Sequence, residues 1–439
     1  MYPNLYYAFE DLFGIKIKGL QLINSFGFFV AIAFLVGAWV LTKELRRKEA
    51  EGLLGYTERT ITTNQQISWF DVALNFVLGF FLGFKIIGAF LIDSAMDDPQ
   101  AFIFSSQGHL VAGLLVGLFF GGWKFKDKRQ TSSLKPEKRV VRIWPHDRVG
   151  DMTIYAAIFG FAGAKLFDIL ESPAAFIRSW NEWRAGNSDA AGFLFSGLTI
   201  YGGLIIATIA IIVYARKHKI HVLHLADAFA TTMMIAYAIG RLGCQVSGDG
   251  DWGVPNGAYI STPDAKIIEA TPEQANMALQ MNAAFYIPEL HIDSISQAKH
   301  PSTKAFAGLP NWLFAYNYPH NVVDAGSKIQ GCEGKFCSQL PIPAYPTPLY
   351  EVLMCTFLFF VLWALRKRIK LAGRLAALYL IFNGIERFLI EQIRVNVPYD
   401  QLPFQPTQAE IISVLLIICG IILYVVAPKL QPKPTTIKA

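Results

Sequence analysis

The sequence predicts an all-α polytopic membrane protein with about nine transmembrane helices. Composition is the first reason, because 53% of the residues are hydrophobic, only 16% are charged, and the mean hydropathy is +0.36. The second reason is length, since a transmembrane helix needs about 20 mostly apolar residues and nine runs of the chain meet that need. The third is the alternation of basic and less basic loops along the chain.

The nine apolar runs define the predicted spans. A backbone amide inside lipid must be satisfied within its own segment, so each run is expected to be a helix. Buried helices of a water-soluble protein would not explain so many runs of this length. The predicted spans are residues 22–42, 71–92, 106–123, 151–170, 192–214, 225–247, 348–365, 374–394 and 408–427.

The basic residues predict the orientation, because cytoplasmic loops carry an excess of Lys and Arg. The net charge of +6 is explained by these loops and indicates no nucleic-acid partner. We therefore expect the N-terminus outside and the C-terminus in the cytoplasm. Of the 39 Lys and Arg residues, 25 lie in segments 43–70, 124–150, 215–222, 366–374 and 428–439. Only 9 lie in the alternating segments 1–21, 93–105, 171–191, 248–347 and 395–407.

Three parts of the chain are expected. Residues 1–255 hold the first six helices, residues 256–345 form a loop-rich extracytoplasmic cap, and residues 346–439 hold the last three helices and a cytoplasmic tail. One short helix is predicted in the cap, starting at Pro272, because proline favours the first helical turn.

Cys332 and Cys337 lie in the cap, on the oxidising side of the membrane, where a disulfide is possible. Their spacing, without further His or Cys nearby, does not match a zinc site, so no metal is expected.

Two stretches resemble each other and predict a duplicated helical hairpin, residues 71–123 and 151–214. Asp71 leads into Gly83-Phe84-Lys85, and Asp151 leads into Gly163-Ala164-Lys165. Chance recurrence of Gly and Phe in membrane helices is the alternative. Transporters also carry repeats, so the repeat alone does not decide function.

Polar residues at membrane depth indicate the site. Arg241 ends an apolar run and opens a Gly-rich acidic loop, and a guanidinium there is costly enough to suggest function. In the eighth helix, Asn383, Arg387, Glu391 and Arg394 fall on one face. A simple Arg387–Glu391 pair that holds helices together is the alternative. The whole set points instead to a site that receives an anionic group from lipid.

Two further residues have open interpretations. Tyr201, in the string Ser196 to Leu204, is either an interfacial belt residue or part of the site. Glu351, in the first turn of the seventh helix, either favours the helix dipole or lines the cavity.

These strings together resemble the prolipoprotein diacylglyceryl transferase family. Thr407-Gln408 before the last helix also fits a glutamine of the family. The resemblance is carried, in chain order, by Ser196 to Leu204, Gly240 to Gly253, Pro346-Thr347-Pro348-Leu349-Tyr350-Glu351 and Arg387 to Arg394.

The resemblance implies a transferase of the bacterial inner membrane, with its active site toward the periplasmic face. The diacylglyceryl group of phosphatidylglycerol would move to the lipobox cysteine in the signal peptide of a preprolipoprotein, releasing glycerol 1-phosphate. No metal or cofactor is needed. A transporter or flippase for an anionic lipid or metabolite is the alternative, and a non-catalytic scaffold is a third hypothesis.

The resemblance also suggests roles for individual residues. Arg241 and Arg387 would bind the phosphate in bidentate fashion and stabilise its growing charge. Asp249 or Glu391 would orient them or take the thiol proton, since the thiolate is the nucleophile. Tyr201 would complete the catalytic set. The expected substrate-binding residues are Arg241, Gly253, Asn383, Arg394, Glu351 and Gln408.

The chain departs from the family at several of these places. Tyr201 stands where the family often has His, and tyrosine, with a pKa of about 10, is a poor base near neutral pH. A hydrogen bond from its hydroxyl to phosphate or thiol is the expected role. Cys244 replaces a family Asn, and both Phe26 and Asn383 replace a Tyr. The acidic loop carries one extra residue, so Asp249 is matched to the family Glu.

Overall fold

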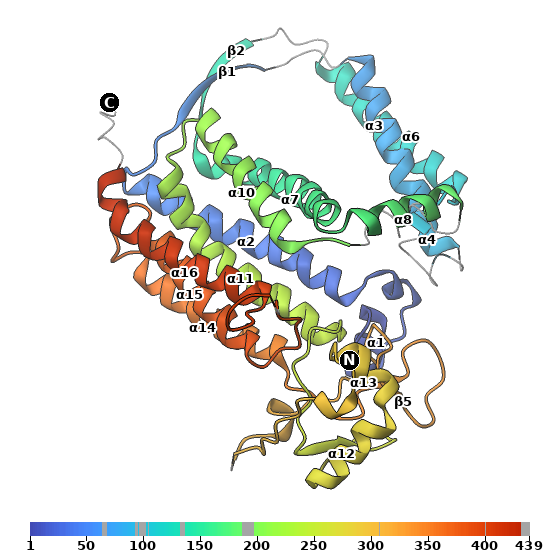
Figure 1. Cartoon of the computed structure of the whole chain (residues 1–439). Helices are drawn as coiled ribbons and strands as arrows, with labels where there is room; N and C mark the ends of the chain where they lie inside the picture. Colours follow the sequence, from blue (N-terminus) through green and yellow to red (C-terminus); the bar gives the residue numbers. More distant parts are fainter. Residues whose placement is uncertain are drawn as a thin grey trace. The chain divides into compact units, whose positions relative to one another are not determined.

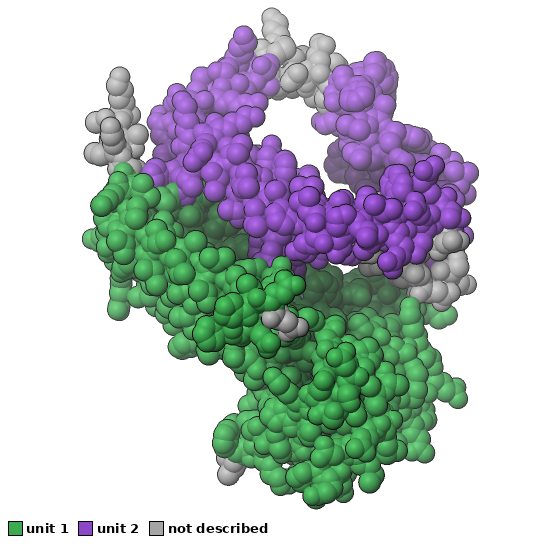
Figure 2. Space-filling model, in the orientation of Figure 1, with its two compact units in different colours: residues 1–44, 223–439 green, residues 45–222 purple. Residues whose placement is uncertain are grey.

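The structure is a computed structural model of the 439-residue chain. It describes residues 1–63, 68–92, 95, 102–103, 105–131, 137–186, 197–306, 308–399 and 401–431. The chain folds into two compact units, which Figure 2 shows in separate colours. Unit 1 comprises Met1–Glu44 and Leu223–Ala439, and unit 2 comprises Leu45–Val222.

Unit 1 is built on long apolar helices (Figure 1). They are α2 (Ser25–Ala50, as far as Glu44), α11 (Val222–Ser247), α14 (Thr347–Leu365), α15 (Arg374–Glu391) and α16 (Gln408–Val426). Their shared core is apolar and buries Val40 of α2, Met234 of α11, Leu362 of α14 and Leu375 of α15. Burial of these side chains is expected to fix the helices that carry the charged residues.

Glycines let α15 and α16 approach closely. A Cβ added at Gly384 would lie 2.7 Å from the carbonyl oxygen of Ser413, and one added at Gly420 would lie 2.8 Å from that of Ala377. Small residues at such contacts are the usual solution in membrane helix packing. The contact therefore sets the position of α15, which bears two of the predicted site residues.

The start of α15 is capped by another helix. Gly373, just before α15, adopts a left-handed conformation with φ of 89°. The carboxylate of Asp227, on α11, accepts hydrogen bonds from the backbone N–H groups of Gly373 and Ala376, both at 3.0 Å. The first N–H groups of a helix have no partner within it, so Asp227 fixes α15 to α11.

The segment predicted as the cap belongs to unit 1 and is rich in loops. Its short helices are α12 (Pro272–Met281), which the sequence predicted, and α13 (Ala283–Glu289), which it did not. Two small antiparallel pairs, β3 (Tyr259–Ser261) with β4 (Ile267–Glu269) and β5 (Ser327–Lys328) with β6 (Ser338–Gln339), tie the loops together. The Cys332–Cys337 disulfide that the sequence allowed is formed.

Unit 2 holds two helical hairpins. The first pairs the continuous helical segment α3 (Trp69–Phe81), η2 (Leu82–Ile87) and α4 (Gly88–Leu91) with α6 (Leu110–Thr131). The second pairs α7 (Val149–Glu171) with α10 (Ile200–Lys217). Between the two arms of the second hairpin, the described residues also form the short helix α8 (Pro173–Arg184).

The two hairpins make matching contacts. A Cβ added at Gly83 would lie 2.3 Å from the carbonyl oxygen of Ala112, and one at Gly163 would lie 2.5 Å from that of Gly202. The residue after each glycine accepts a backbone hydrogen bond from the partner arm, His109 N to Phe84 O at 3.0 Å and Thr199 N to Ala164 O at 3.1 Å. These contacts agree with a duplicated hairpin.

Each hairpin is preceded along the chain by one strand, and the two strands pair as an antiparallel ribbon. β1 (Thr57–Thr63) leads into α3 and β2 (Glu137–Ile143) leads into α7, separated along the chain by the same interval as Asp71 and Asp151. The register pairs Thr57 with Ile143 and Thr60 with Val140. The sequence analysis did not predict this ribbon.

Each of the nine predicted spans coincides with helix in the described residues, although the predicted span 192–214 starts in the undescribed segment 187–196 and its helix is seen from Ile200. Within the described ranges, seven helices are long and apolar enough to cross a membrane by length and composition. The two others are α6 and α15, whose charged residues lower their apolar character. The short helix α1 (Leu5–Phe13) and the helix α8 were not predicted.

Candidate functional site

Arg241, Arg387 and Arg394 are brought together in unit 1 by three acidic side chains. Arg241 lies in the last turns of α11, Arg387 lies in α15, and Arg394 follows the end of α15. Their side chains are only 11%, 15% and 13% exposed. Charges this buried need partners, and each of the three has a carboxylate partner.

Glu351 is the centre of the cluster. Its side chain, in the first turns of α14, is completely buried. One oxygen lies 2.9 Å from Nε of Arg241, and the other lies 3.5 Å from Nη1 of Arg387 and accepts a hydrogen bond from the Tyr237 hydroxyl at 2.9 Å. Glu351 therefore links the arginines of α11 and α15, and lies within the cluster rather than only at a helix start.

Asp251 joins Arg241 to Arg394. One carboxylate oxygen pairs with Nη1 of Arg241 and the other with Nη2 of Arg394. Its backbone carbonyl accepts a hydrogen bond from the Thr347 hydroxyl at 2.8 Å. Asp251, rather than Asp249, is thus the loop carboxylate that contacts the arginines.

Glu391 holds Arg387 from the other side. Its carboxylate lies 2.9 Å from Nη2 of Arg387, so the i,i+4 pair considered in the sequence analysis is present. It also accepts hydrogen bonds from Asn396 at 2.5 Å and from the Thr407 hydroxyl at 2.6 Å. A carboxylate held by three donors is well suited to orient Arg387.

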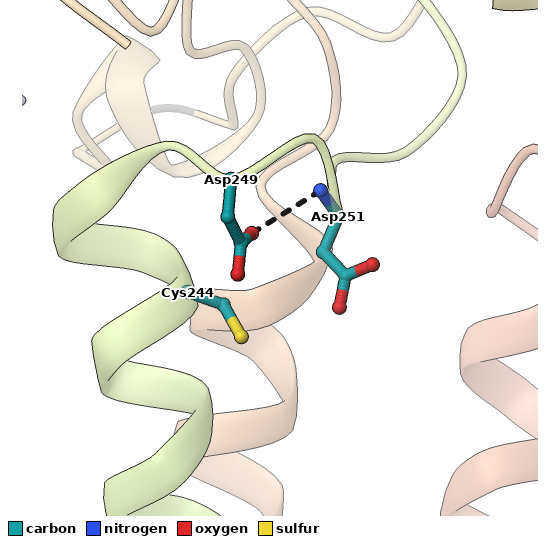
Figure 3. Close-up of side chains that lie close together, drawn as sticks. All are labelled: Cys244, Asp249 and Asp251. Atoms are coloured by element: carbon teal, nitrogen blue, oxygen red, sulfur yellow. Dashed lines mark hydrogen bonds between the residues drawn. The ribbon is translucent and has the colours of Figure 1, made fainter. Parts of the chain in front are cut away.

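Asp249 has different surroundings. It lies in the loop after α11, and its carboxylate accepts a hydrogen bond from the backbone N–H of Asp251 at 3.4 Å (Figure 3). Burial raises the pKa of Asp249 above its ordinary value, and the negative charge of Asp251 raises it further. No arginine forms an ion pair with Asp249 in the part of the chain that the structure describes. A raised pKa is what a general base needs near neutral pH.

Cys244, Asp249 and Asp251 lie close together (Figure 3), with their ligand atoms within 4.8 Å of one another. This grouping resembles a metal site in residue type. However, both oxygens of Asp251 already face guanidinium groups, and Nη1 of Arg241 lies 3.9 Å from Sγ of Cys244. A cation there would be repelled by these arginines, so the surroundings suit an anion better than a metal.

Gly253 explains why the loop can lie against α15. Its N–H donates to the carbonyl oxygen of Tyr345 at 2.9 Å, and it forms a β-bridge with Arg394. A Cβ at this position would lie 2.6 Å from the carbonyl oxygen of Ile393 and 2.9 Å from Cγ2 of Thr347. Only glycine allows this approach, which holds Asp251 and Arg394 in reach of each other.

A family model described as prolipoprotein diacylglyceryl transferase matches residues 108–426. The chain belongs to this family. Similar proteins named phosphatidylglycerol–prolipoprotein diacylglyceryl transferase occur in Treponema denticola, Leptospira interrogans and Burkholderia mallei. They are 25%, 23% and 25% identical to the chain over alignments covering 56%, 70% and 64% of it. These alignments cover 63%, 75% and 79% of the three relatives.

The match to the diacylglyceryl transferase family starts close to α6 and leaves out α2. The structure nevertheless includes α2 in unit 1, where Val40 is part of the buried core and a Cβ at Gly243 would lie 3.0 Å from Cβ of Phe29. Gly243 is two positions from Arg241. The helix outside the matched region therefore still packs against the end of α11 that bears Arg241.

The other predicted residues lie at different places. Asn383 is partly buried on α15, and no hydrogen bond joins it to the cluster among the described residues. Gln408 is the first residue of α16. Tyr201 is the second residue of α10, in unit 2, and is partly buried. Ser196, from the same family string, lies outside the described residues.

The sequence analysis missed four contributors to the cluster, namely Tyr237, Asp251, Asn396 and Thr407. Tyr237 could have been found by helical spacing, because it lies one turn before Arg241 and the guanidinium lies 5.3 Å from its ring centroid. Asp251 lies in the same loop, but the sequence analysis matched Asp249 to the acidic residue of the family. Nothing in the sequence places Asn396 or Thr407 beside Glu391, because the fold of the chain after α15 brings both residues there.

Proposed function

We propose that this protein transfers the diacylglyceryl group of phosphatidylglycerol to the lipobox cysteine of preprolipoproteins. The observation that carries the proposal is the Arg241–Glu351–Arg387 cluster in a chain of the diacylglyceryl transferase family. Two guanidinium groups on one buried carboxylate are held ready for a phosphate, whose oxygens suit bidentate contacts. None of the contacts described above favours the transporter.

The reaction needs one bond made and one broken. The thiolate sulfur attacks the glyceryl carbon that bears the phosphate, and the C–S bond forms as the C–O bond breaks. The electron pair of the C–O bond leaves with glycerol 1-phosphate. Arg241 and Arg387 stabilise the charge that grows on the phosphate, while Arg394 and Asp251 hold Arg241 in position. The proton of the thiol goes to Asp249 and then to solvent.

The other residues predicted from the sequence have supporting roles in this proposal. Glu391 orients Arg387, and Glu351 orients both arginines. Gly253 lets the loop approach, Asn383 and Gln408 contact the lipid headgroup or the peptide, and the Tyr201 hydroxyl donates a hydrogen bond to phosphate or thiol. No metal or cofactor takes part.

We further propose that nine helices span the bacterial inner membrane, with the N-terminus and the cap in the periplasm and the C-terminus in the cytoplasm. The distribution of Lys and Arg supports this orientation. It puts Arg241, at the outer end of α11, toward the periplasmic face. Signal peptides of exported lipoproteins reach the enzyme on that side, from the surrounding bilayer.

Reconstitution tests the function. The purified chain in vesicles of phosphatidylglycerol, given a lipobox peptide, is expected to yield glycerol phosphate and a peptide heavier by one diacylglyceryl group. A peptide with Ser in place of the lipobox Cys is the control. Arg241→Lys and Arg387→Ala are each expected to lower kcat/KM at least about 100-fold. The lysine keeps the positive charge but loses the bidentate contact with the phosphate, and the alanine removes the charge. Absence of product with the wild type, or full activity in both variants, would contradict the proposal.

A further inference from the structure

Glu386 is a buried acid that the proposed mechanism does not use. It immediately precedes Arg387 on α15 and is 1% exposed. Neither of its carboxyl oxygens has a hydrogen-bond partner within the described part of the chain. Consecutive helical residues point about 100° apart, so Glu386 lies on a different side of α15 from Arg387.

The surroundings of Glu386 include the centre of the arginine cluster. Its carboxyl group is electrostatically coupled to Glu351, Arg387 and Arg241. The hydroxyl groups of two tyrosines and one thiol also lie around it. The neighbours are Tyr237 and Arg241 on α11, Glu351 and Cys355 on α14, and Tyr379 and Arg387 on α15.

The cluster is electrically balanced without Glu386. Arg241, Arg387 and Arg394 face the three carboxylates of Asp251, Glu351 and Glu391. An ionised Glu386 would add a negative charge beside Glu351, with no donor to satisfy it. Burying a carboxylate without partners is much more costly than burying the neutral acid.

Phosphatidylglycerol brings one further negative charge to this region. To bind it, Arg241 and Arg387 must accept a phosphate beside the three carboxylates that already pair with the arginine cluster. An additional buried negative charge would oppose this step, because charges interact strongly where water is scarce. A protonated Glu386 leaves the cluster able to accept the anion.

We propose that Glu386 is a positioning residue that must be uncharged for the anionic lipid to bind, so that the affinity for phosphatidylglycerol falls as Glu386 ionises. The inference rests on the proposed transferase function. It assigns to Glu386 control of lipid binding through Glu351, and no part in the bond-making step. Lipid binding is then coupled to the proton on Glu386.

The KM for phosphatidylglycerol, measured with the reconstituted full chain from about pH 6 to about pH 10, tests this coupling. In the wild type, KM is expected to rise with pH, approaching about tenfold per pH unit once the ionised form prevails. In Glu386→Gln, which is neutral at every pH, KM should stay low and flat. Glu386→Asp keeps a titratable group and should keep the rise. The dependence of kcat on pH should differ from that of KM.

Glu44→Gln is the matched control. Glu44 is equally buried and is paired with Arg366 at 3.2 Å, with no contact to the arginine cluster among the described residues. This variant should keep the wild-type rise of KM. A wild-type KM that does not change with pH, or an equal rise in Glu386→Gln, would overturn the proposal.

A second measurement covers the case in which Glu386→Gln does not fold. Titration of the wild type with phosphatidylglycerol alone, by calorimetry in two buffers of different ionisation enthalpy, should show proton uptake at alkaline pH. Lipid binding without proton uptake would overturn the role of Glu386. This binding measurement needs no turnover, so a protein that binds lipid with proton uptake but forms no product would contradict only the transferase function.

Discussion

Asp249 and Asp251 stand two positions apart in one loop and have different surroundings. Asp251 is held by two arginines, whereas Asp249 has a raised pKa and no arginine ion pair among the described residues. A carboxylate paired with two arginines serves as an orienting group. A carboxylate with a raised pKa holds a proton more firmly and so serves better as the base.

The two aspartates should therefore respond differently to removal of their charge. Asp251→Asn is expected to lower kcat/KM at least about tenfold at all pH values, because Arg241 and Arg394 lose their shared partner. Asp249→Asn should lower kcat mainly by removing the increase of kcat with pH that the wild type shows as Asp249 ionises. Rates measured across the pH range check both. Identical pH profiles in wild type and Asp249→Asn would exclude Asp249 as the base.

The raised pKa of Asp249 also has a consequence for stability. At a pH below the unfolded value of about 3.9, both states hold the proton. As pH rises from there through the higher folded pKa, the unfolded chain releases the proton first, and this group's contribution to stability is lost. Asp249→Asn should remove that decline, which thermal unfolding in detergent at acidic and neutral pH can detect.

The chemistry of a side chain decides whether its place in the site can be predicted from the sequence. Arg241, Arg387 and Glu391 were found because a charge in an apolar helix is costly wherever it lies. The contact of Glu351 with both arginines could not be found, because it depends on how α11, α14 and α15 pack. Glu386 was visible in the sequence, but its lack of a partner appears only in three dimensions.

At the scale of elements, α15 depends on a cap that it does not supply itself. Asp227 of α11 satisfies the N–H groups of Gly373 and Ala376. No local pattern near residue 373 predicts it, since the acid is far away in the sequence. The apolar runs predicted helices well, because length and hydropathy are local properties. The ribbon of β1 and β2 was missed because its strands are short, mostly polar and exposed.

Asp227→Ala is expected to destabilise the protein by about 1–2 kcal/mol, the usual cost of losing a helix cap. Two buried N–H groups would lose their acceptor at the start of the helix that carries Arg387. Thermal unfolding in detergent measures the loss. Asp227→Asn keeps one acceptor oxygen and should lose less. An unchanged unfolding temperature in Asp227→Ala would show that the cap is not needed.

At the scale of the whole molecule, seven helices of the described residues meet the criteria of length and composition for a membrane span. With α6 and α15, the helical segments reach the predicted number of nine. Seven and nine are both odd numbers, so either puts the two ends of the chain on opposite sides. A hairpin adds two spans and leaves the orientation of all later helices unchanged. An inserted hairpin can therefore lengthen a family member without moving its arginines to the other face.

Single cysteines introduced at exposed positions can test the proposed orientation. Lys299→Cys, in the cap, should react with a membrane-impermeant maleimide in intact spheroplasts. Arg139→Cys, on β2, should react only after lysis, because the basic loops are expected in the cytoplasm. The unmodified chain, whose free cysteines are Cys244, Cys355 and Cys419, gives the background. The reverse labelling pattern would invert the orientation.

The register of the β1–β2 ribbon has a consequence for self-association. Thr60 pairs with Val140, and these residues stand at equivalent positions of the two strands, so a two-fold axis through their midpoint exchanges β1 with β2. An interface that relates equivalent segments by a two-fold axis is isologous, as in a symmetric homodimer. A chain with only one such strand would find the matching edge on a second copy of itself. Here both strands belong to one chain, so the edge of β1 is paired with β2 within the molecule instead of with a second copy.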